Sequence, residues 1–484
     1  MFRIALLLLA AIFPGVPFAG DSKFTPTHRV AGIGVARDDL SEELLAARTD
    51  QMIESQTFGI MRDPQALPGA KRITRDPKLQ DIFATAAASS GLPATLIEAI
   101  AYLESWGDPK AQSFTGPRGI MQVSGATAVS MGLKVTYATR YHVVKERVAV
   151  KVKGKSKPVY KTVTRRYPYK EPVRDERLMP ERAIPAAARY LAGMEQKFGG
   201  EDWAIFAYHC GQGCVAMMQD LTRRARGIQK DHATVARMFF GASPAWNREL
   251  YEAIQQQMQR DYSPTYWFRI MRAQQLLALY RRDPDEFTRL AREYQSEFAA
   301  NSRAPNRLSV WLKHDDLVYR SDGDIRAAGT SLAYAFDRPE YFGYALKMVP
   351  TPENFSQASP AAIGTLTYIA FETRRLYEET GASTPFRPLP VTSLVQPEDL
   401  VRKGNPEALA HCSGQVFDID YSALPTAELE CLRFVLSDLG WSGYLGFVEE
   451  GKDNLHIGSS PAARDFFTQV YREAFEKSAE AAVR

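Results

Sequence analysis

The chain has 484 residues, enough for about three domains of roughly 150 residues each. Hydrophobic residues make up 45% of it and charged residues 24%, the ordinary balance of a globular protein, which excludes a fibrous or disordered chain. The net charge is only +4, so a broad positive surface for nucleic acid is not expected. We therefore expect several folded domains with sizeable hydrophobic cores.

The N-terminus has the pattern of an export signal. Met1 to Arg3 gives a short positive start, an apolar run covers residues 4–16, and small residues follow at Ala19 and Gly20. We interpret residues 1–20 as a signal peptide and expect a periplasmic or secreted protein; the alternative is a retained membrane anchor. No later stretch is long and apolar enough to span a bilayer, so no transmembrane span is expected after signal removal. Residues 21–79 follow as an N-terminal extension.

Glu104 is a carboxylate on an apolar helix stripe. Apolar residues at Leu96, Ile97, Ile100 and Leu103 have the spacing of an amphipathic helix, and Glu104 continues the row formed by residues 97 and 100. Desolvation disfavours the ionised carboxylate, so we expect a raised pKa and a proton donor near neutral pH. Glu98 lies off this row and is expected to face water.

Several ordered motifs follow Glu104. They are Glu104-Ser105, the run Gly116-Pro-Arg-Gly-Ile-Met-Gln122, Thr127-Ala128 and Ala207-Tyr-His-Cys-Gly211. Together they resemble the soluble lytic transglycosylases, relatives of goose-type lysozyme, over about residues 80–220, and we expect the domain to cover residues 80–230. The resemblance implies a mainly α lysozyme-like domain. His209 stands where that family usually has asparagine.

The resemblance also implies a mechanism with one carboxyl group. Glu104 would protonate the glycosidic oxygen between N-acetylmuramic acid and N-acetylglucosamine in peptidoglycan, then act as base while the sugar's 6-hydroxyl closes a 1,6-anhydro ring. No cofactor is implied for this domain. The substrate-binding residues would be Ser105, Met121, Gln122, Tyr208 and His209. Two alternatives remain: a hydrolytic muramidase, and a non-catalytic wall-binding scaffold.

A strongly basic segment interrupts this domain. Residues 134–174 contain 13 Lys or Arg residues and two acidic residues, a local charge of +11. Apolar and basic residues alternate on both sides of a turn at residues 154–158, which predicts a β-hairpin inserted into the helical domain. It would attract an anionic wall polymer or an acidic protein partner; the alternative is a solvated arm whose lysines prevent edge pairing. Nucleic acid is not expected, because an exported chain with one basic patch rarely meets it.

Amphipathic segments over residues 231–385 predict a helical connector with no chemical cluster of its own. The four cysteines fall into two local pairs. In an oxidising compartment we expect disulfides between Cys210 and Cys214 and between Cys412 and Cys431.

The last hundred residues carry a second cluster. His411, Gly414 and Asp418 have the spacing His-x-x-Gly-x-x-x-Asp, and His456 follows later. This resembles the zinc signature of the D-alanyl-D-alanine peptidase and hedgehog-like fold, which implies an α+β domain over residues 386–484. Two histidines and an aspartate suit Zn²⁺ with one position open for water. The resemblance makes His411, Asp418 and His456 the metal ligands.

The expected base of that second site departs from the family. Asp453 stands three residues before His456, where the family has glutamate, and its side chain is one methylene shorter. Glu449 and Glu450 are alternative bases. Gln396 and Leu409 also depart from the family pattern. The domain is therefore expected either to cut stem peptides or to bind the wall.

Overall fold

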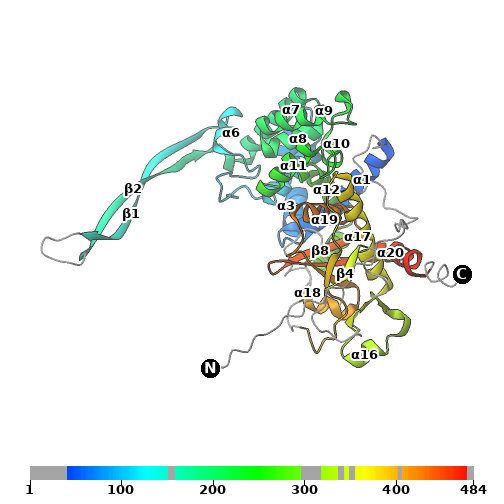
Figure 1. Cartoon of the computed structure of the whole chain (residues 1–484). Helices are drawn as coiled ribbons and strands as arrows, with labels where there is room; N and C mark the ends of the chain where they lie inside the picture. Colours follow the sequence, from blue (N-terminus) through cyan, green and yellow to red (C-terminus); the bar gives the residue numbers. More distant parts are fainter. Residues whose placement is uncertain are drawn as a thin grey trace.

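The computed structural model describes residues 41–150, 159–295, 318–335, 343–347, 355–401 and 406–476. The predicted signal peptide and the tip of the predicted hairpin, residues 151–158, lie outside this part of the chain. Figure 1 shows a helical body, a second body that contains a sheet, and a long two-stranded arm. No helix in the described ranges has the length and hydropathy needed to cross a membrane.

The helical body contains helices that come before, within and after the segment with the sequence motifs, residues 104–211. Its helices are α1 (Glu42–Ser55), α2 (Thr57–Met61), α3 (Ala66–Arg75), α4 (Pro77–Ser90), α5 (Ala94–Ser105), α6 (Gly125–Ser130), α7 (Pro180–Phe198), α8 (Glu201–Cys210), α9 (Gln212–Arg224), α10 (Val235–Phe240), α11 (Arg248–Arg260), α12 (Ser263–Arg282) and α13 (Pro284–Tyr294). Short 3₁₀ turns lie at Glu176–Leu178 (η1) and Lys230–His232 (η2).

One hydrophobic core runs through all of this body. It contains Ile60 from α2, Ile97 from α5, Phe206 from α8 and Phe268 from α12, each fully buried. The predicted boundaries at residues 80 and 231 therefore fall inside one core. The N-terminal extension and the first part of the predicted connector are structural parts of the helical body.

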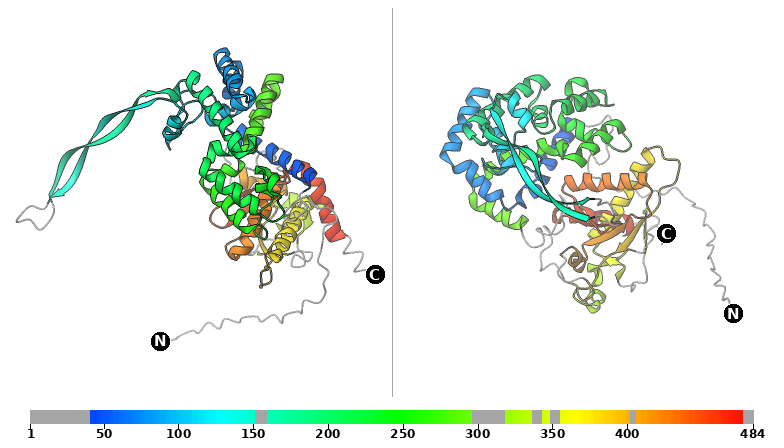
Figure 2. Two further views of the ribbon diagram at one scale, coloured as in Figure 1. Left: turned by 90° about the horizontal axis from the view of Figure 1, so that it is seen from above. Right: turned by 90° about the vertical axis from the view of Figure 1, so that its left-hand side faces the viewer.

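The predicted hairpin is confirmed by the structure. Strand β1 (Val135–Val150) pairs antiparallel with β2 (Val159–Asp175), with one irregularity between Thr136 and Tyr137. The ribbon projects away from the helical body in Figure 1 and in the left-hand view of Figure 2. Sixteen residues at about 3.3 Å each give an arm about 50 Å long.

The second body has a five-stranded sheet in the order β4-β6-β7-β9-β8. These strands are β4 (Tyr344–Leu346), β6 (Leu389–Ser393), β7 (Val416–Asp420), β8 (Leu445–Glu450) and β9 (Asn454–Ser459). Only β4 and β6 are parallel. The remaining elements are α16 (Asp322–Arg326), η4 (Gly329–Ser331), β3 (Ala333–Tyr334), β5 (Gln357–Ala358), α17 (Pro360–Glu379), α18 (Pro406–Leu409), η7 (Ala410–Ser413), α19 (Thr426–Trp441), η8 (Pro461–Ala463), α20 (Arg464–Tyr471) and η9 (Arg472–Glu476).

Helix α17 is central to the second body. Its side chains Ile363, Leu366 and Ile369 are fully buried in the same core as Phe417 and Ile457 of the sheet. The predicted connector, residues 231–385, is thus divided between two cores. The predicted start of the last domain at residue 386 would leave out the helix on which its sheet packs.

The two bodies touch through α1, α10 and α19. Arg48 of α1 donates to Asp438 of α19, and both side chains are buried. Phe239 and Trp441 pack edge to face with ring centroids 4.8 Å apart. Apolar and ionic contacts together therefore hold the bodies against each other.

The predicted disulfides are not formed. All four cysteines are free thiols in the structure. Cys412 packs beside Val401 while Cys431 belongs to the core beneath the sheet, so the expected partners occupy separate hydrophobic clusters. Cys210 and Cys214 do interact, but as a thiol pair across the α8–α9 junction.

Candidate active site

Glu104 lies in the last turn of α5. The helix starts after Pro93 and ends where Trp106 takes a left-handed conformation. The side chain is half-buried, because α5 packs against α12 on this side. The end of α5 therefore holds the Glu104 carboxyl group among largely apolar neighbours, with part of the side chain exposed to solvent.

Two residues of α12 face this carboxyl group. The Tyr266 hydroxyl donates a hydrogen bond of 2.5 Å to Glu104 Oε1. Arg269, one turn further along α12, acts on Glu104 through its charge. Sequence reasoning missed both residues, since it assigned residues 231–385 to a helical connector with no chemical cluster of its own. The available signal was a phenol and a guanidinium three positions apart, on one face of a helix.

The electrostatics of Glu104 place its titration near neutrality. Burial raises its pKa to about 7, although the hydrogen bond from Tyr266 and the charge of Arg269 both lower it. Burial also raises the pKa of Tyr266 well above its ordinary value, so the phenol stays protonated and remains a donor. The raised pKa expected from the helix stripe is thus found. Besides burial, the groups that act on it are a phenol and a guanidinium, and neither is a carboxylate.

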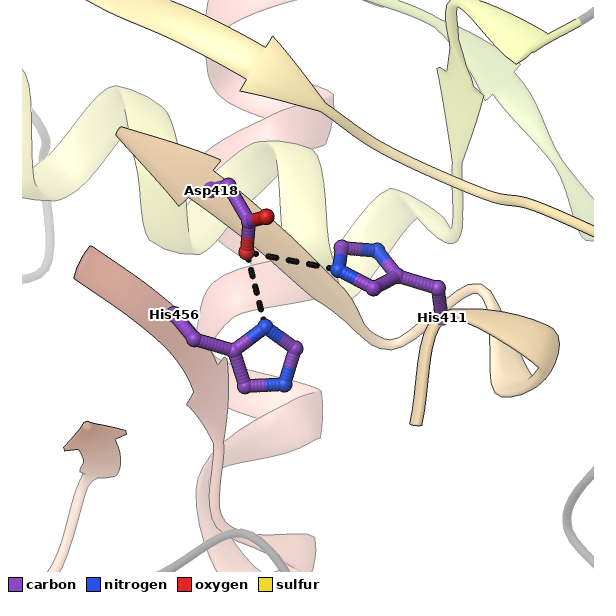
Figure 3. Close-up of side chains that lie close together, drawn as sticks. All are labelled: His411, Asp418 and His456. Carbon is purple, nitrogen blue, oxygen red and sulfur yellow. Dashed lines mark hydrogen bonds and ion pairs between the residues drawn. The ribbon is translucent and has the colours of Figure 1, made fainter. Parts of the chain in front are cut away.

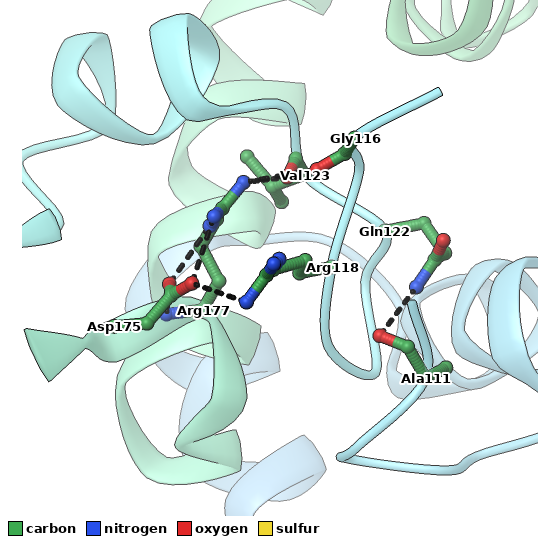
Figure 4. A network of polar contacts seen from close by, with 7 residues as sticks. All are labelled: Ala111, Gly116, Arg118, Gln122, Val123, Asp175 and Arg177. Carbon is green, nitrogen blue, oxygen red and sulfur yellow. Dashed lines mark hydrogen bonds and ion pairs between the residues drawn. The ribbon is translucent and has the colours of Figure 1, made fainter. Parts of the chain in front are cut away.

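The Gly-Ile-Met-Gln segment is held tightly beside α5. Ser105 Oγ donates to the Ile120 carbonyl at 2.8 Å, which ties the helix end to this loop. Gln122 has a positive φ of 44°, and its side-chain amide donates to the carbonyls of Gly119 and Ala111 (Figure 4). A non-glycine residue in this conformation costs about 1 kcal/mol or more, which surrounding contacts must offset. The Gln122 amide supplies such contacts.

Gly119 allows this loop to approach the base of the arm. Its φ is +77°, and an added Cβ would lie 1.8 Å from the Arg177 carbonyl oxygen. The Arg177 guanidinium donates to the Val123 carbonyl and is paired with Asp175 at 2.7 Å (Figure 4). The arm is therefore anchored on the loop that carries Met121 and Gln122.

Tyr208 and His209, both predicted to bind substrate, make hydrogen bonds to other parts of the protein beside the site. Tyr208 donates its hydroxyl to the Met121 carbonyl at 2.8 Å and so supports the loop. His209 Nδ1 lies 3.0 Å from Ser263 Oγ, and its ring packs on Tyr266 with centroids 4.4 Å apart. Burial lowers the pKa of His209, despite the opposing charge of Asp261. Burial raises the pKa of Tyr208 and the charge of Glu104 raises it further, while His209 contacts the site through Tyr266.

The expectation for Glu98 is wrong. This carboxylate is buried with 3% of its surface exposed, and it accepts hydrogen bonds from Arg281 and Gln80. Helix α12 covers the side of α5 that the sequence pattern assigned to water. Glu98 therefore has a structural role at the α5–α12 contact.

The second predicted site is brought together by the structure. His411, Asp418 and His456 come from η7, β7 and β9, and their ligand atoms all lie within 4.8 Å of one another (Figure 3). His456 Nδ1 is 2.7 Å from Asp418 Oδ1, and His411 Nε2 is 3.3 Å from the same oxygen. Burial raises the pKa of Asp418, but the charges and hydrogen bonds of both histidines outweigh this and lower it overall.

The donor set fits a metal ion. His411 Nδ1 lies 2.6 Å from the Leu394 carbonyl and donates to it, which leaves Nε2 on the side of Asp418. With a metal ion bound there, Nε2 would give up its proton to Asp418 or solvent and offer a lone pair. Zinc takes two imidazole nitrogens and a carboxylate in this way. Gly414 allows the turn between the ligands, since its φ is +65° and a Cβ would lie 2.9 Å from Leu332.

The expected base, Asp453, does not join this cluster. It is exposed in the turn before β9, and its backbone carbonyl accepts from the Tyr421 amide. Asp453 lies outside the strand, one residue before β9 begins at Asn454, and has no partner in the ladder. Glu450 pairs with Asn454 in the ladder and therefore shares the face of His456, while Glu449 lies on the other face, paired with Arg433.

Comparison with known proteins supports the first resemblance. Residues 81–147 and 159–230 match the model of the family described as Transglycosylase SLT domain. The chain is 34% identical over 133 residues to "Peptidoglycan transglycosylase gp16" of Escherichia phage T7, covering 27% of this chain and 8% of that protein. It is 28% identical over 165 residues to "Membrane-bound lytic murein transglycosylase F 2" of Alkalilimnicola ehrlichii, covering 33% of this chain and 27% of that protein.

A third relative matches a shorter stretch more closely. The chain is 47% identical over 79 residues to "Membrane-bound lytic murein transglycosylase F" of Aeromonas salmonicida, covering 16% of this chain and 15% of the relative. The chain thus spans less than a third of the length of these relatives. Glu104, the loop and the Tyr208 helix all fall inside the family match, whereas Tyr266 and Arg269 lie beyond it.

Proposed function

We propose that this protein is a peptidoglycan-degrading lytic transglycosylase with Glu104 as its sole acid and base. The observation that carries the proposal is a single carboxyl group with a pKa of about 7, held by a phenol and a guanidinium inside a transglycosylase-like domain. A glycosidase that activates water or forms a glycosyl-enzyme needs a second carboxylate close to the first. One carboxyl group suffices when the sugar supplies its own nucleophile.

The site suits both steps of such a reaction. Protonated Glu104 gives its proton to the bridging oxygen as the glycosidic C–O bond breaks. The resulting carboxylate is stabilised by Tyr266 and Arg269 and accepts the proton of the 6-hydroxyl, while that oxygen bonds to C1. No water is consumed, and Glu104 ends protonated, so atoms and protons balance. A pKa near the working pH favours both transfers.

The other predicted site residues would bind the sugar or hold the groups around Glu104 in position. Gln122 lies on the loop next to Glu104, where it would line the sugar cleft, with Ser105 and Tyr208 holding that loop in place. The Met121 side chain, predicted to bind substrate, is instead buried in the hydrophobic core, and its carbonyl anchors the loop to Tyr208. His209 would act by packing on Tyr266. The relatives named above act on murein or peptidoglycan by their printed names, which supports the same substrate here.

Incubating the purified chain with purified peptidoglycan tests this function. We expect released muropeptides with 1,6-anhydro ends, as seen by mass spectrometry, and no release by Glu104→Gln. Products with free reducing ends would instead show a muramidase. A protein that binds peptidoglycan but releases nothing would be a scaffold.

We also propose that His411, Asp418 and His456 hold zinc. The supporting observation is their convergence, from three separate elements, into one buried cluster of ligand atoms. Zinc bound there would polarise water for attack on a peptide bond. His411 and His456 would be fixed in orientation by the Leu394 carbonyl and the strand pair. A wall peptidase that cuts stem peptides is the activity this site would serve, in the periplasm or outside the cell.

A further inference from the structure

The two faces of the β1–β2 arm differ in charge. Directly paired residues of an antiparallel ladder share a face, and neighbours along a strand alternate. The register pairs Thr139 with Lys170, Val143 with Arg166 and Lys145 with Thr164. Over residues 137–149 and their partners 160–172, one face, here called the cationic face, therefore carries four cations and no acidic residue: Lys145, Arg147, Arg166 and Lys170. Asp175, at the root of the arm beyond the register irregularity, pairs with Val135 and is engaged by Arg177.

The opposite face is close to neutral. It carries both acidic residues of this stretch, Glu146 and Glu171, and each is engaged by an arginine of that face. Arg140 lies 2.7 Å from Glu171, and Arg165 lies 3.4 Å from Glu146. His142 and Tyr169 stack on this face with centroids 4.0 Å apart. Its side chains are thus largely occupied with one another.

The cationic face also presents aromatic rings to solvent. Tyr141 is 58% exposed and Tyr160 57%, whereas Tyr169 on the opposite face is 37% exposed. Arg147 lies over the Tyr160 ring, 5.6 Å from its centroid. Exposed tyrosine rings offer apolar surface for sugar faces, and the cations between them offer charge-assisted hydrogen bonds to carboxylates.

The base of the arm is fixed to the candidate active-site loop. Arg177 joins Asp175 at the end of β2 to the Val123 carbonyl, and Arg118 lies 3.9 Å from the same carboxylate (Figure 4). The root of the arm and Glu104 are thus both tied to the loop that carries Gln122, so a polymer bound at Glu104 would lie near the arm. The polymer expected to contact the arm is therefore the substrate of the proposed active site.

We propose that the cationic face of the arm binds the carboxylate-bearing stem peptides and sugar faces of peptidoglycan strands outside the active site. The proposal rests on the proposed function for the identity of the polymer. Charge complementarity selects this occupant, because stem peptides present carboxylates at intervals along a strand. An arm about 50 Å long contacts several of them at once, and weak individual contacts then add.

Sedimentation with insoluble peptidoglycan sacculi tests the proposal. The sacculi are stripped of covalently attached phosphate polymers, and all proteins carry Glu104→Gln so that the sacculi stay intact. Each exposed ion pair contributes little alone, so all four cations of the cationic face are replaced together. We expect the quadruple variant to bind at least about tenfold more weakly; it carries Lys145→Gln, Arg147→Gln, Arg166→Gln and Lys170→Gln. Amidating the sacculus carboxyl groups should weaken binding of the parent protein to a similar extent.

Two matched variants control for charge and for the arm itself. One removes four exposed cations of the helical body, Lys71, Lys78, Arg223 and Lys230, and should bind as the parent does. The other removes the two ion pairs of the opposite face, Arg140 with Glu171 and Arg165 with Glu146, and should also bind normally. Equal binding by the cationic-face variant, or equal binding to amidated sacculi, would overturn the proposal.

Further probes separate other polyanions from peptidoglycan. Binding to double-stranded DNA or to phosphatidylglycerol vesicles that is tighter than binding to sacculi, and lost in the cationic-face variant, would assign the face to those partners instead. Failure of the proposed function has a different signature: the protein with Glu104 intact would release no anhydro-muropeptides while sacculus binding still depended on the cationic face.

Discussion

Tyr266 donates a 2.5 Å hydrogen bond to Glu104 across 162 residues of sequence, from a helix that lies beyond the transglycosylase family match. The bond favours the ionised carboxylate, while burial favours the protonated one. The balance of these two effects sets a pKa of about 7, so Tyr266 is a positioning and tuning residue for the proposed acid and base.

Tyr266→Phe should change the pH profile of muropeptide release. Without the phenol the pKa of Glu104 rises, so its acid form persists to higher pH and the alkaline limb of kcat moves up by about one unit. At pH 7 kcat should fall about tenfold, because the carboxylate needed for the second proton transfer is less stable. The measurement is the initial rate of anhydro-muropeptide release between pH 5 and 9.

His209→Asn is the matched control for that experiment. The substitution installs the residue usual in the resembled family and removes the ring that packs on Tyr266, but leaves the phenol in place. Its alkaline limb should stay where that of the parent protein lies. A limb that moved equally in both variants would show that packing around Tyr266, rather than its hydroxyl, sets the pKa of Glu104.

Glu104→Gln should alter stability as well as activity, in a pH-dependent way. The carboxyl pKa is raised from 4.5 to about 7 by folding, so its favourable effect is complete below pH 4.5 and is lost as the pH rises through 7. Denaturant unfolding should therefore show little difference at pH 4.5. At pH 8.5 the variant should be more stable by about 1–2 kcal/mol. Equal stability at both values would contradict the raised pKa.

The local features of the site could be predicted from sequence, while its long-range partners could not. Glu104, the Gly119 to Gln122 loop and the alternating strands of the arm follow from periodicity over a few residues. Tyr266 and the burial of Glu98 depend on how α12 lies on α5, which no local pattern specifies. The domain boundaries failed for the same reason, since Phe268 and Ile363 join cores formed by distant segments.

The C-terminal cluster shows the same division. The spacing of His411, Gly414 and Asp418 predicted a common site because a short turn links η7 to β7. Which residues of two neighbouring strands share a face of the sheet, however, depends on the register of their pairing. The pairing of Glu450 with Asn454 shows that Glu450 shares a face with His456, whereas Asp453 is exposed in the turn before β9. Residue spacing alone had favoured Asp453.

Zinc content of the full chain tests the metal site. Residues 386–484 alone would lack α17, on which the sheet packs, so the whole protein is the right sample. We expect about one zinc per chain after dialysis, measured by plasma mass spectrometry, and loss of most of it in His411→Ala. His142→Ala, on the exposed arm, is the histidine control and should retain the metal. A parent chain without zinc would remove the proposed metal site.

Peptidase activity, assayed on isolated stem peptides, should depend on Glu450 more than on Asp453. A general base must come within hydrogen-bond reach of the attacking water, and the ladder places Glu450 on the face of the metal ligands. Glu450→Gln should lower peptide cleavage by at least about 100-fold, while Asp453→Asn should change it by less than about threefold. The reverse order would show that the turn at Asp453 rearranges around the metal.

The buried pair of Arg48 and Asp438 should govern the contact between the two bodies. Both side chains are withdrawn from water, so removing one partner leaves an uncompensated charge, which costs about 3–5 kcal/mol. Asp438→Ala should therefore lower the midpoint of denaturant unfolding and separate the unfolding of the two bodies, as seen when tryptophan fluorescence and circular dichroism give transitions that no longer coincide. The double variant Arg48→Met with Asp438→Leu should recover most of the loss, because the surrounding Phe240 and Trp441 rings offer apolar contacts. Unchanged cooperativity in Asp438→Ala would mean that the aromatic contacts at Phe239 and Trp441 suffice to couple the bodies.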